Sequence, residues 1–127
     1  TGSEVGRCAE KDMPLIGFPA HWAPNDLTFY TGTQFPARYR DGAFIAFHGS
    51  WNRAPNPQEG YQVVFVPARG DGFDTEWETF ADRFRREDDP DAGFTARPVG
   101  VAVGPDGSLY VTDSVQGRIW RIVYRGG

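Results

Sequence analysis

A short stretch of the chain gathers side chains that bind ligands. Residues 48–53 supply an imidazole, a hydroxyl, an indole, a carboxamide and a guanidinium, on His48, Ser50, Trp51, Asn52 and Arg53. Such groups exchange hydrogen bonds, stack on flat ligands and bind carboxylates. The stretch directly follows an apolar run at residues 43–47, which is typical of a buried strand. A rigid strand that ends in polar side chains often presents a binding site.

Other candidates are spread along the chain. His21 and Trp22 lie in a segment flanked by prolines, Arg97 precedes a strand-like run, and Asp113 follows one. Each candidate also has a purely structural interpretation. A histidine or tryptophan can cap or pack locally, an asparagine or aspartate can stabilise a turn, and an arginine can be a solvated charge. The residues by themselves leave both interpretations open.

The chain carries no self-contained catalytic motif. It has no Gly-x-Ser-x-Gly elbow, no phosphate-binding loop and no His-Glu-x-x-His helix motif. His21 and His48 are 27 positions apart, so they form no local metal motif. We therefore assign no metal ligand and no catalytic residue from these patterns.

Composition favours a small all-β domain. The 127 residues include 15% aromatic residues, with 16 glycines and 10 prolines, a mixture typical of strands joined by frequent turns. The net charge is −4 and no basic face is apparent, so we expect no nucleic-acid partner. No apolar run approaches the roughly 20 residues of a membrane span. Cys8 is the single cysteine and cannot form an internal disulfide.

The expected strands repeat along the chain. We predict strands at residues 26–30, 43–47, 61–66, 99–103, 109–112 and 118–124, a weak strand at 13–18, and a strand or short helix at 77–84. The order strand, turn, strand, loop, strand recurs after about 60 residues, which is typical of β-propeller blades. A sandwich or barrel of the same strands is the alternative.

A propeller needs about four blades or more, and this chain has about two. It also begins at Thr1 rather than Met. We therefore expect a β-propeller fragment. Residues 1–24 would form a loop and the outer strand of a preceding blade, residues 25–84 one blade, and residues 97–125 most of the final blade.

The expected topology brings the candidate residues together. In an antiparallel meander, successive connections alternate between the two ends of a sheet. The connections before residue 27, after 47, before 99 and after 112 then share one end, which we call the polar end. They contain His21, Trp22, residues 48–53, Arg97 and Asp113. The opposite connections hold mostly generic turn residues, so we expect the site at the polar end.

Several motifs resemble one family. Phe47-His48-Gly49-Ser50-Trp51-Asn52-Arg53, Ala20-His21-Trp22-Ala23-Pro24 and Arg97-Pro98-Val99-Gly100 are similar to segments of the soluble quinoprotein glucose/sorbosone dehydrogenases. The resemblance spans residues 19–125 and implies the C-terminal third of a six-bladed propeller. It further implies oxidation of aldose sugars or related alcohols and aldehydes with pyrroloquinoline quinone (PQQ) and Ca²⁺. The setting would be the periplasm or the cell exterior, with a cytochrome or quinone as electron acceptor and the remaining blades as partners.

The resemblance also implies roles for single residues. Arg97 matches a family arginine that contacts the cofactor, and Arg53 lies where glucose dehydrogenases have a lysine contact. His48, Ser50 and Asn52 share that cofactor-binding loop, and the expected substrate contacts are His21, Trp22 and Trp51. Val99 stands where some relatives have a second arginine. The family's base histidine and its Ca²⁺ ligands lie upstream of this chain.

A non-catalytic function is the alternative. A propeller without redox activity would bind carbohydrate or protein through Trp22 and Trp51, and would need no cofactor.

Overall fold

The computed structural model describes residues 6–82, 84 and 96–126, and its regular elements are almost entirely strands. The strands are β1 (Pro24–Phe29), β2 (Ala43–Phe47), β3 (Gln62–Val66), β4 (Ala68–Arg69), β5 (Gly72–Phe73), β6 (Glu78–Ala81), β7 (Pro98–Val103), β8 (Leu109–Asp113) and β9 (Ile119–Ile122). Two short 3-10 helices, η1 (Gly6–Glu10) and η2 (Ala37–Tyr39), complete the described elements. No described helix has the length and apolar character to cross a membrane.

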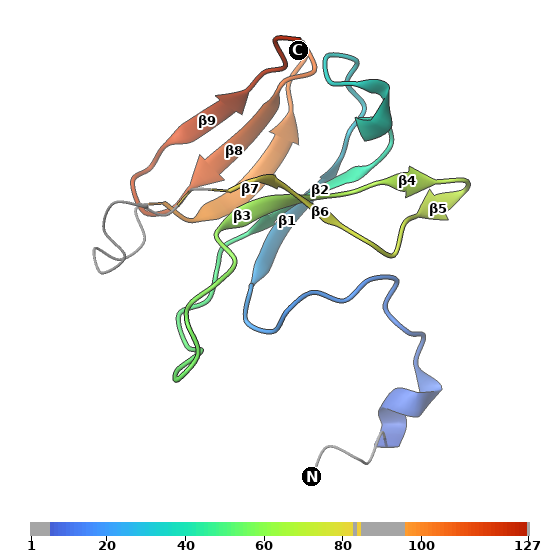
Figure 1. The fold of residues 1–127 in the computed structure, drawn as a ribbon, viewed down its shortest axis with the longest axis vertical. Coiled ribbons are helices and arrows are strands. Elements are labelled where there is room, and N and C mark those ends of the chain that lie inside the picture. Colours follow the sequence, from blue (N-terminus) through green and yellow to red (C-terminus); the bar gives the residue numbers. More distant parts are fainter. Residues whose placement is uncertain (1–5, 83, 85–95, 127) are drawn as a thin grey trace.

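The strands form two antiparallel meanders. The first sheet has the order β1-β2-β3-β6 and the second the order β7-β8-β9, while β4 and β5 form a small separate hairpin. The sheets lie side by side, with β1 against β7 (Figure 1). The all-β antiparallel fold expected from the sequence is confirmed.

Two apolar clusters explain why β2 and β3 are buried on both faces. Phe44, Ala46, Val63 and Phe65 face the second sheet and pack with Val101, Leu109 and Val111 in an inter-sheet core. The alternate residues of the same strands, Ala43, Ile45, Phe47, Val64 and Val66, form an outer core with Trp22. Because successive strand residues point to opposite faces, a continuous apolar run satisfies both cores. This double burial accounts for the apolar run at residues 43–47.

Two local expectations, at residues 77–84 and 13–18, have different outcomes in the structure. Of the segment 77–84, for which a strand or a short helix was expected, residues 78–81 form β6, which pairs antiparallel with β3. The weak strand expected at residues 13–18 does not form. Pro14 removes a backbone donor there. Ile16 and Phe18 instead lie over the outer core, and Met13 and Leu15 are exposed. The assignment of blades to residue ranges stays a prediction, and the side chain of Cys8 lies outside the described part.

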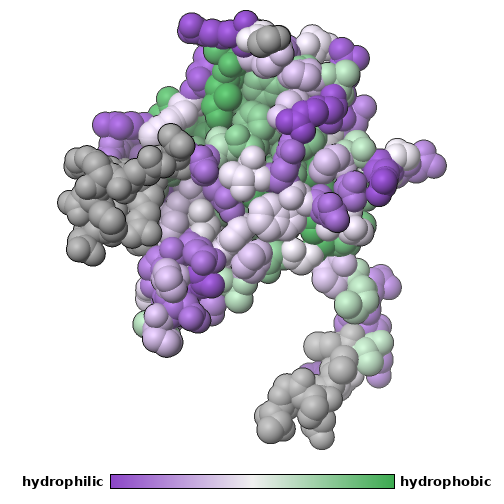
Figure 2. All heavy atoms as spheres, viewed as in Figure 1, coloured by the Kyte–Doolittle hydropathy of each residue, from purple (hydrophilic) through white to green (hydrophobic). Residues whose placement is uncertain are grey.

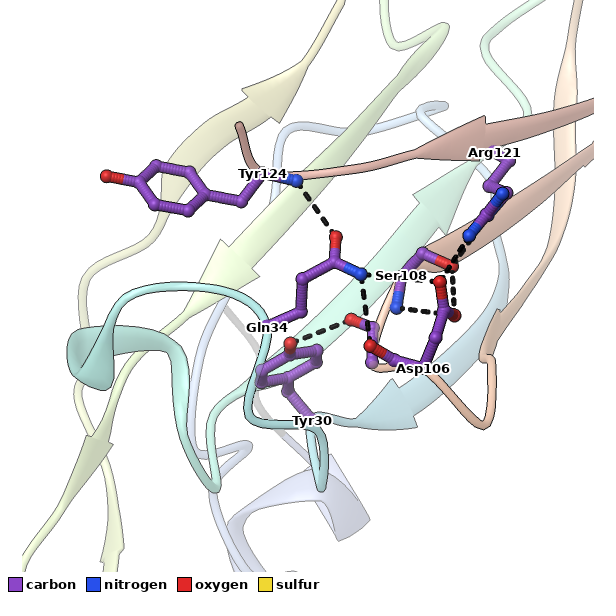
Figure 3. A network of polar contacts seen from close by, with 7 residues as sticks. Tyr30, Gln34, Asp106, Ser108, Arg121 and Tyr124 are labelled. Carbon is purple, nitrogen blue, oxygen red and sulfur yellow. Dashed lines mark hydrogen bonds and ion pairs between the residues drawn. The ribbon is translucent and has the colours of Figure 1, made fainter. Parts of the chain in front are cut away.

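The two sheets are tied together at the end opposite the polar end. The buried hydroxyl of Tyr30 donates to the carbonyl of Gly107 at 2.7 Å and accepts the N–H of Phe35 at 2.9 Å. The side chain of Gln34 donates to the carbonyl of Asp106 and accepts the N–H of Tyr124 (Figure 3). These bonds join the β1–β2 connection to the β7–β8 turn and to the segment after β9.

Candidate functional site

The four connections expected at the polar end do lie at one end of the paired sheets. In Figure 1 the loop between β2 and β3 projects to the lower left, the turn between β8 and β9 lies at the left, and the chain enters β1 at the lower centre. Figure 2 shows mostly hydrophilic residues on that projecting loop, whereas the most hydrophobic residues of this face lie in the upper part of the view.

Arg97 links the two sheets at this end. Its Nε donates to the carbonyl of His48 at 3.0 Å, and its Nη2 donates to the carbonyl of Gly49 at 2.6 Å. Its backbone carbonyl accepts the N–H of Ser114 at 3.2 Å. The guanidinium carbon also lies 5.7 Å from the ring centroid of Tyr61, within the range of a cation–π contact. Two backbone carbonyls and an aromatic face thus contact the cation.

His48 bridges to the last turn of the chain. Its Nε2 shares a hydrogen bond with the hydroxyl of Ser114 at 2.9 Å, across 66 positions of sequence. Partial burial lowers the pKa of His48 below its ordinary value, and the nearby Arg97 cation lowers it further, while Asp113 opposes both. The imidazole is consequently neutral near pH 7. It offers a hydrogen bond at the polar end without adding a positive charge.

Asp113 organises the turn between β8 and β9. Its carboxylate accepts the backbone N–H groups of Arg97, Val115 and Gln116 at 2.8 to 3.1 Å. Burial acts to raise the pKa of Asp113, but these three bonds outweigh it and the net shift is downward. The aspartate therefore stays ionised at neutral pH and fixes the backbone of Arg97.

Several polar side chains of the loop between β2 and β3 bond to partners within the same loop. Arg53 forms an ion pair with Glu59 at 2.7 Å and donates to the carbonyl of Pro57 at 2.8 Å. Ser50 is buried, and its hydroxyl accepts the N–H of Glu59 at 2.8 Å. The cofactor contacts expected of Arg53 and Ser50 stay predictions, and both side chains have structural partners within the loop.

The expected substrate contacts differ in exposure. Trp22 is only 9% exposed and packs edge-on against Phe47 and Trp77, while its indole N–H donates to Glu59. Trp51 is 78% exposed, and His21 and Asn52 are exposed as well. Trp51 therefore has a ring face available for stacking, whereas the ring of Trp22 is largely covered by packing.

Three partners at the polar end had not been singled out from the sequence. Ser114 contacts His48, Glu59 pairs with Arg53, and Tyr61 lies beside Arg97. Ser114 follows Asp113 in a predicted turn at the polar end, so topology was a signal for it. Nothing in the local pattern marks Glu59 or Tyr61, because their partners are set by how the loop folds back.

Metal binding finds no support in the described residues. Among them, no group of three or more His, Cys, Asp or Glu side chains lies close enough to hold an ion. The arrangement at the polar end instead suits an anionic or hydrogen-bonding ligand. It combines the Arg97 cation with the neutral imidazole of His48 and the hydroxyl of Ser114.

Comparison with known proteins gives a consistent picture. A family model described as TrAA12-like matches residues 3–125. A protein of Borreliella burgdorferi, named only as uncharacterized, is 36% identical over 116 residues, which cover 90% of this chain and 29% of that protein. A pyrroloquinoline quinone-dependent pyranose dehydrogenase of Coprinopsis cinerea is 31% identical over 130 residues, covering 90% of this chain and 17% of the relative. The chain thus spans less than a third of these curated relatives.

A solved structure extends the comparison to the fold. A glucose dehydrogenase structure superimposes with a TM-score of 0.59 at 23% identity, covering 91% of this chain and 30% of that structure. At this identity the likeness concerns the fold alone. It agrees with the expectation of a propeller fragment, while the place of the fragment within a propeller stays a prediction.

Proposed function

The chain belongs to the TrAA12-like family, and from this premise we propose that it is part of a sugar dehydrogenase that uses PQQ. The relative of Coprinopsis cinerea named as a PQQ-dependent pyranose dehydrogenase supports the cofactor and the substrate class. The observation that carries the proposal for this chain is the Arg97 guanidinium, held at the polar end by the carbonyls of His48 and Gly49.

The donor set fits the proposed cofactor. PQQ carries three carboxylates, and a guanidinium is the side chain best suited to bind a carboxylate. Arg97 would bind such a group, with the neutral His48 as a neighbouring hydrogen-bonding group. When bound, the quinone supplies two-electron oxidation of a sugar carbon, and the protein supplies binding and orientation. Arg53, which pairs with Glu59, would be a second contact for a carboxylate.

Further parts of the proposal follow from the resemblance rather than from the geometry. We propose the periplasm or the cell exterior as location, a cytochrome or quinone as electron acceptor, and further blades as the structural partners. Ca²⁺ is also proposed for the complete protein. The described residues offer no cluster for it, so we derive no step that involves calcium.

The test uses the complete protein that contains this chain. The apoprotein is titrated with PQQ, with and without Ca²⁺, and dye reduction is followed with a panel of aldoses. We expect saturable binding of PQQ and dye reduction only in its presence. A folded protein that neither binds PQQ nor reduces dye would contradict the proposal.

Two arginine variants make the test specific. Arg97→Ala should weaken PQQ binding at least about tenfold, because a charge-assisted contact is lost. Arg38→Ala is the matched control, since Arg38 lies at the opposite end in a surface ion pair with Glu78, and it should change the affinity less than about twofold. Unchanged affinity in Arg97→Ala would exclude Arg97 as a cofactor contact.

A binding module without catalysis is the second candidate, and the exposed indole of Trp51 favours it. An exposed tryptophan ring can stack on the apolar face of a sugar. This candidate predicts saturable glycan binding in the absence of PQQ, which Trp51→Ala would abolish. Binding that requires PQQ would exclude it.

A further inference from the structure

Tyr61 lies directly beneath the polar end. It precedes β3, is only 5% exposed, and belongs to the inter-sheet core. Its hydroxyl donates to the backbone carbonyl of Ser50. The side chain therefore connects the packed core to the loop that presents His48 and Gly49.

The lack of a side chain at Gly49 leaves room for the Tyr61 ring. A Cβ added at Gly49 would lie 2.3 Å from carbon atoms of the ring, far closer than van der Waals contact allows. A Cβ at Gly60 would lie 2.7 Å from the Cα of Gly49. The two ends of the loop thus pack backbone against backbone, with the ring pressed on Gly49.

The backbone conformation of Tyr61 is a further sign that the residue is constrained. Its φ is +48°, in the left-handed region that bulky residues seldom adopt. Such conformations persist where the surroundings over-determine them, and they concentrate at functional sites. Here the surroundings are the ring contact with Gly49 and the hydroxyl bond to Ser50.

The same ring faces the candidate cofactor residue. The Tyr61 ring packs against Gly49, whose carbonyl accepts a hydrogen bond from Nη2 of Arg97 at 2.6 Å. The guanidinium carbon of Arg97 itself lies 5.7 Å from the Tyr61 ring centroid. Tyr61 therefore contacts the guanidinium of Arg97 and also packs against Gly49, one of the residues whose carbonyls hold it.

We propose that Tyr61 is a positioning residue for Arg97. Its ring packs against Gly49 and its hydroxyl holds the carbonyl of Ser50, so that the adjacent carbonyls of His48 and Gly49 keep the Arg97 guanidinium in one orientation toward its anionic ligand. This inference rests on the proposed function, in which that ligand is a carboxylate of PQQ. Tyr61 itself need not contact the quinone.

A double-mutant cycle on the complete apoprotein tests this role, with PQQ affinity as the readout. The variants are Tyr61→Leu, Arg97→Ala and the double variant. If Tyr61 acts through Arg97, Tyr61→Leu should weaken binding about fivefold or more in the native background and less than about twofold in the Arg97→Ala background. An equal fold loss in both backgrounds would overturn the proposal.

Two milder substitutions control for an effect of misfolding on PQQ affinity. Tyr61→Phe keeps the ring and loses only the bond to Ser50, and it should weaken PQQ binding by a smaller factor that again disappears in the Arg97→Ala background. Tyr30→Phe is the matched control, because Tyr30 is also buried and also donates its hydroxyl to a carbonyl, at the opposite end. It should leave PQQ affinity unchanged. A loss of affinity in Tyr30→Phe equal to that in Tyr61→Phe would show a general effect on folding and overturn the proposal.

The outcomes separate this inference from the proposed function. If the native protein binds no PQQ, the proposed function and this inference are both refuted. If the native protein binds PQQ but the effects of Tyr61→Leu and Arg97→Ala are additive, the inference alone is refuted.

Discussion

Asp26 and Val101 are 75 positions apart, yet the Oδ2 of Asp26 accepts the backbone N–H of Val101 at 2.9 Å. Both residues lie where their strands shift register, Asp26 in the pairing of β1 with β2 and Val101 in the pairing of β7 with β8. The shift in β7 also turns the N–H of Gly100 to the hydroxyl of Thr112. The two backbone N–H groups at the irregular part of β7 thus have side-chain acceptors. One of these acceptors, Asp26, belongs to the other sheet.

Removing this carboxylate should loosen the contact between the sheets. Asp26→Ala leaves the N–H of the buried Val101 without its acceptor, and we expect a loss of about 1 to 3 kcal/mol in the free energy of unfolding. Asp26→Asn keeps an acceptor oxygen and should cost less than Asp26→Ala. Denaturant unfolding of the complete protein measures both, and equal losses would contradict the role of the acceptor.

Gly49 should tolerate substitution poorly for a steric reason. Gly49→Ala places a methyl group against the Tyr61 ring and also opposes a φ of +86°. Gly70 is the matched control, since its φ is +57° but no atom lies within 4 Å of an added Cβ. Gly70→Ala should cost about 1 kcal/mol for the backbone alone, and Gly49→Ala should cost about 1 to 3 kcal/mol more through overpacking. Thermal unfolding compares the two, and equal losses would refute the steric argument.

His48 should make stability depend on pH. Its pKa in the folded protein lies below the ordinary value of 6.5, so between these values the unfolded chain binds more protons than the folded one. The stability that the neutral imidazole contributes is therefore complete above pH 6.5 and is lost as the pH falls through the lower, folded pKa.

A variant isolates that contribution. His48→Gln cannot titrate, so the free energy of unfolding of the native protein should fall more steeply than that of the variant as the pH drops below 6.5. The difference should be constant above that pH. Parallel pH profiles throughout would show that His48 does not titrate differently on folding.

Tyr30 should stabilise the end of the molecule opposite the polar end. Tyr30→Phe keeps the stacked ring pair with Phe35 but removes the acceptor of the Phe35 N–H and the donor to Gly107. We expect a loss of about 1 to 3 kcal/mol, because buried polar groups are left unpaired. Tyr124 is exposed, so Tyr124→Phe should change stability by less than about 0.5 kcal/mol. Equal effects in chemical denaturation would contradict this assignment.

The sequence by itself determined the strand framework and the end at which the polar residues gather. The strand predicted at residues 43–47 matches β2 at both limits, because every one of its residues is buried on one face or the other. The Gly-Pro-Asp-Gly sequence at residues 104–107 is typical of a turn, and there the N–H of Gly107 donates to the carbonyl of Gly104 at 2.9 Å. Alternation of connections in a meander then placed His48, Arg97 and Asp113 at one end without any knowledge of their contacts.

Only the tertiary structure decided which partner each polar group has. The loop folds back so that Arg53 meets Glu59, and β6 forms because residues 78–81 find an open edge of β3. Trp22 is drawn into the outer core, while Trp51 stays in solvent. Arg97 meets the carbonyl of His48 across 49 positions. Local sequence reports periodicity and burial, whereas these pairings depend on how loops fold back and how strands distant in the sequence pack against each other.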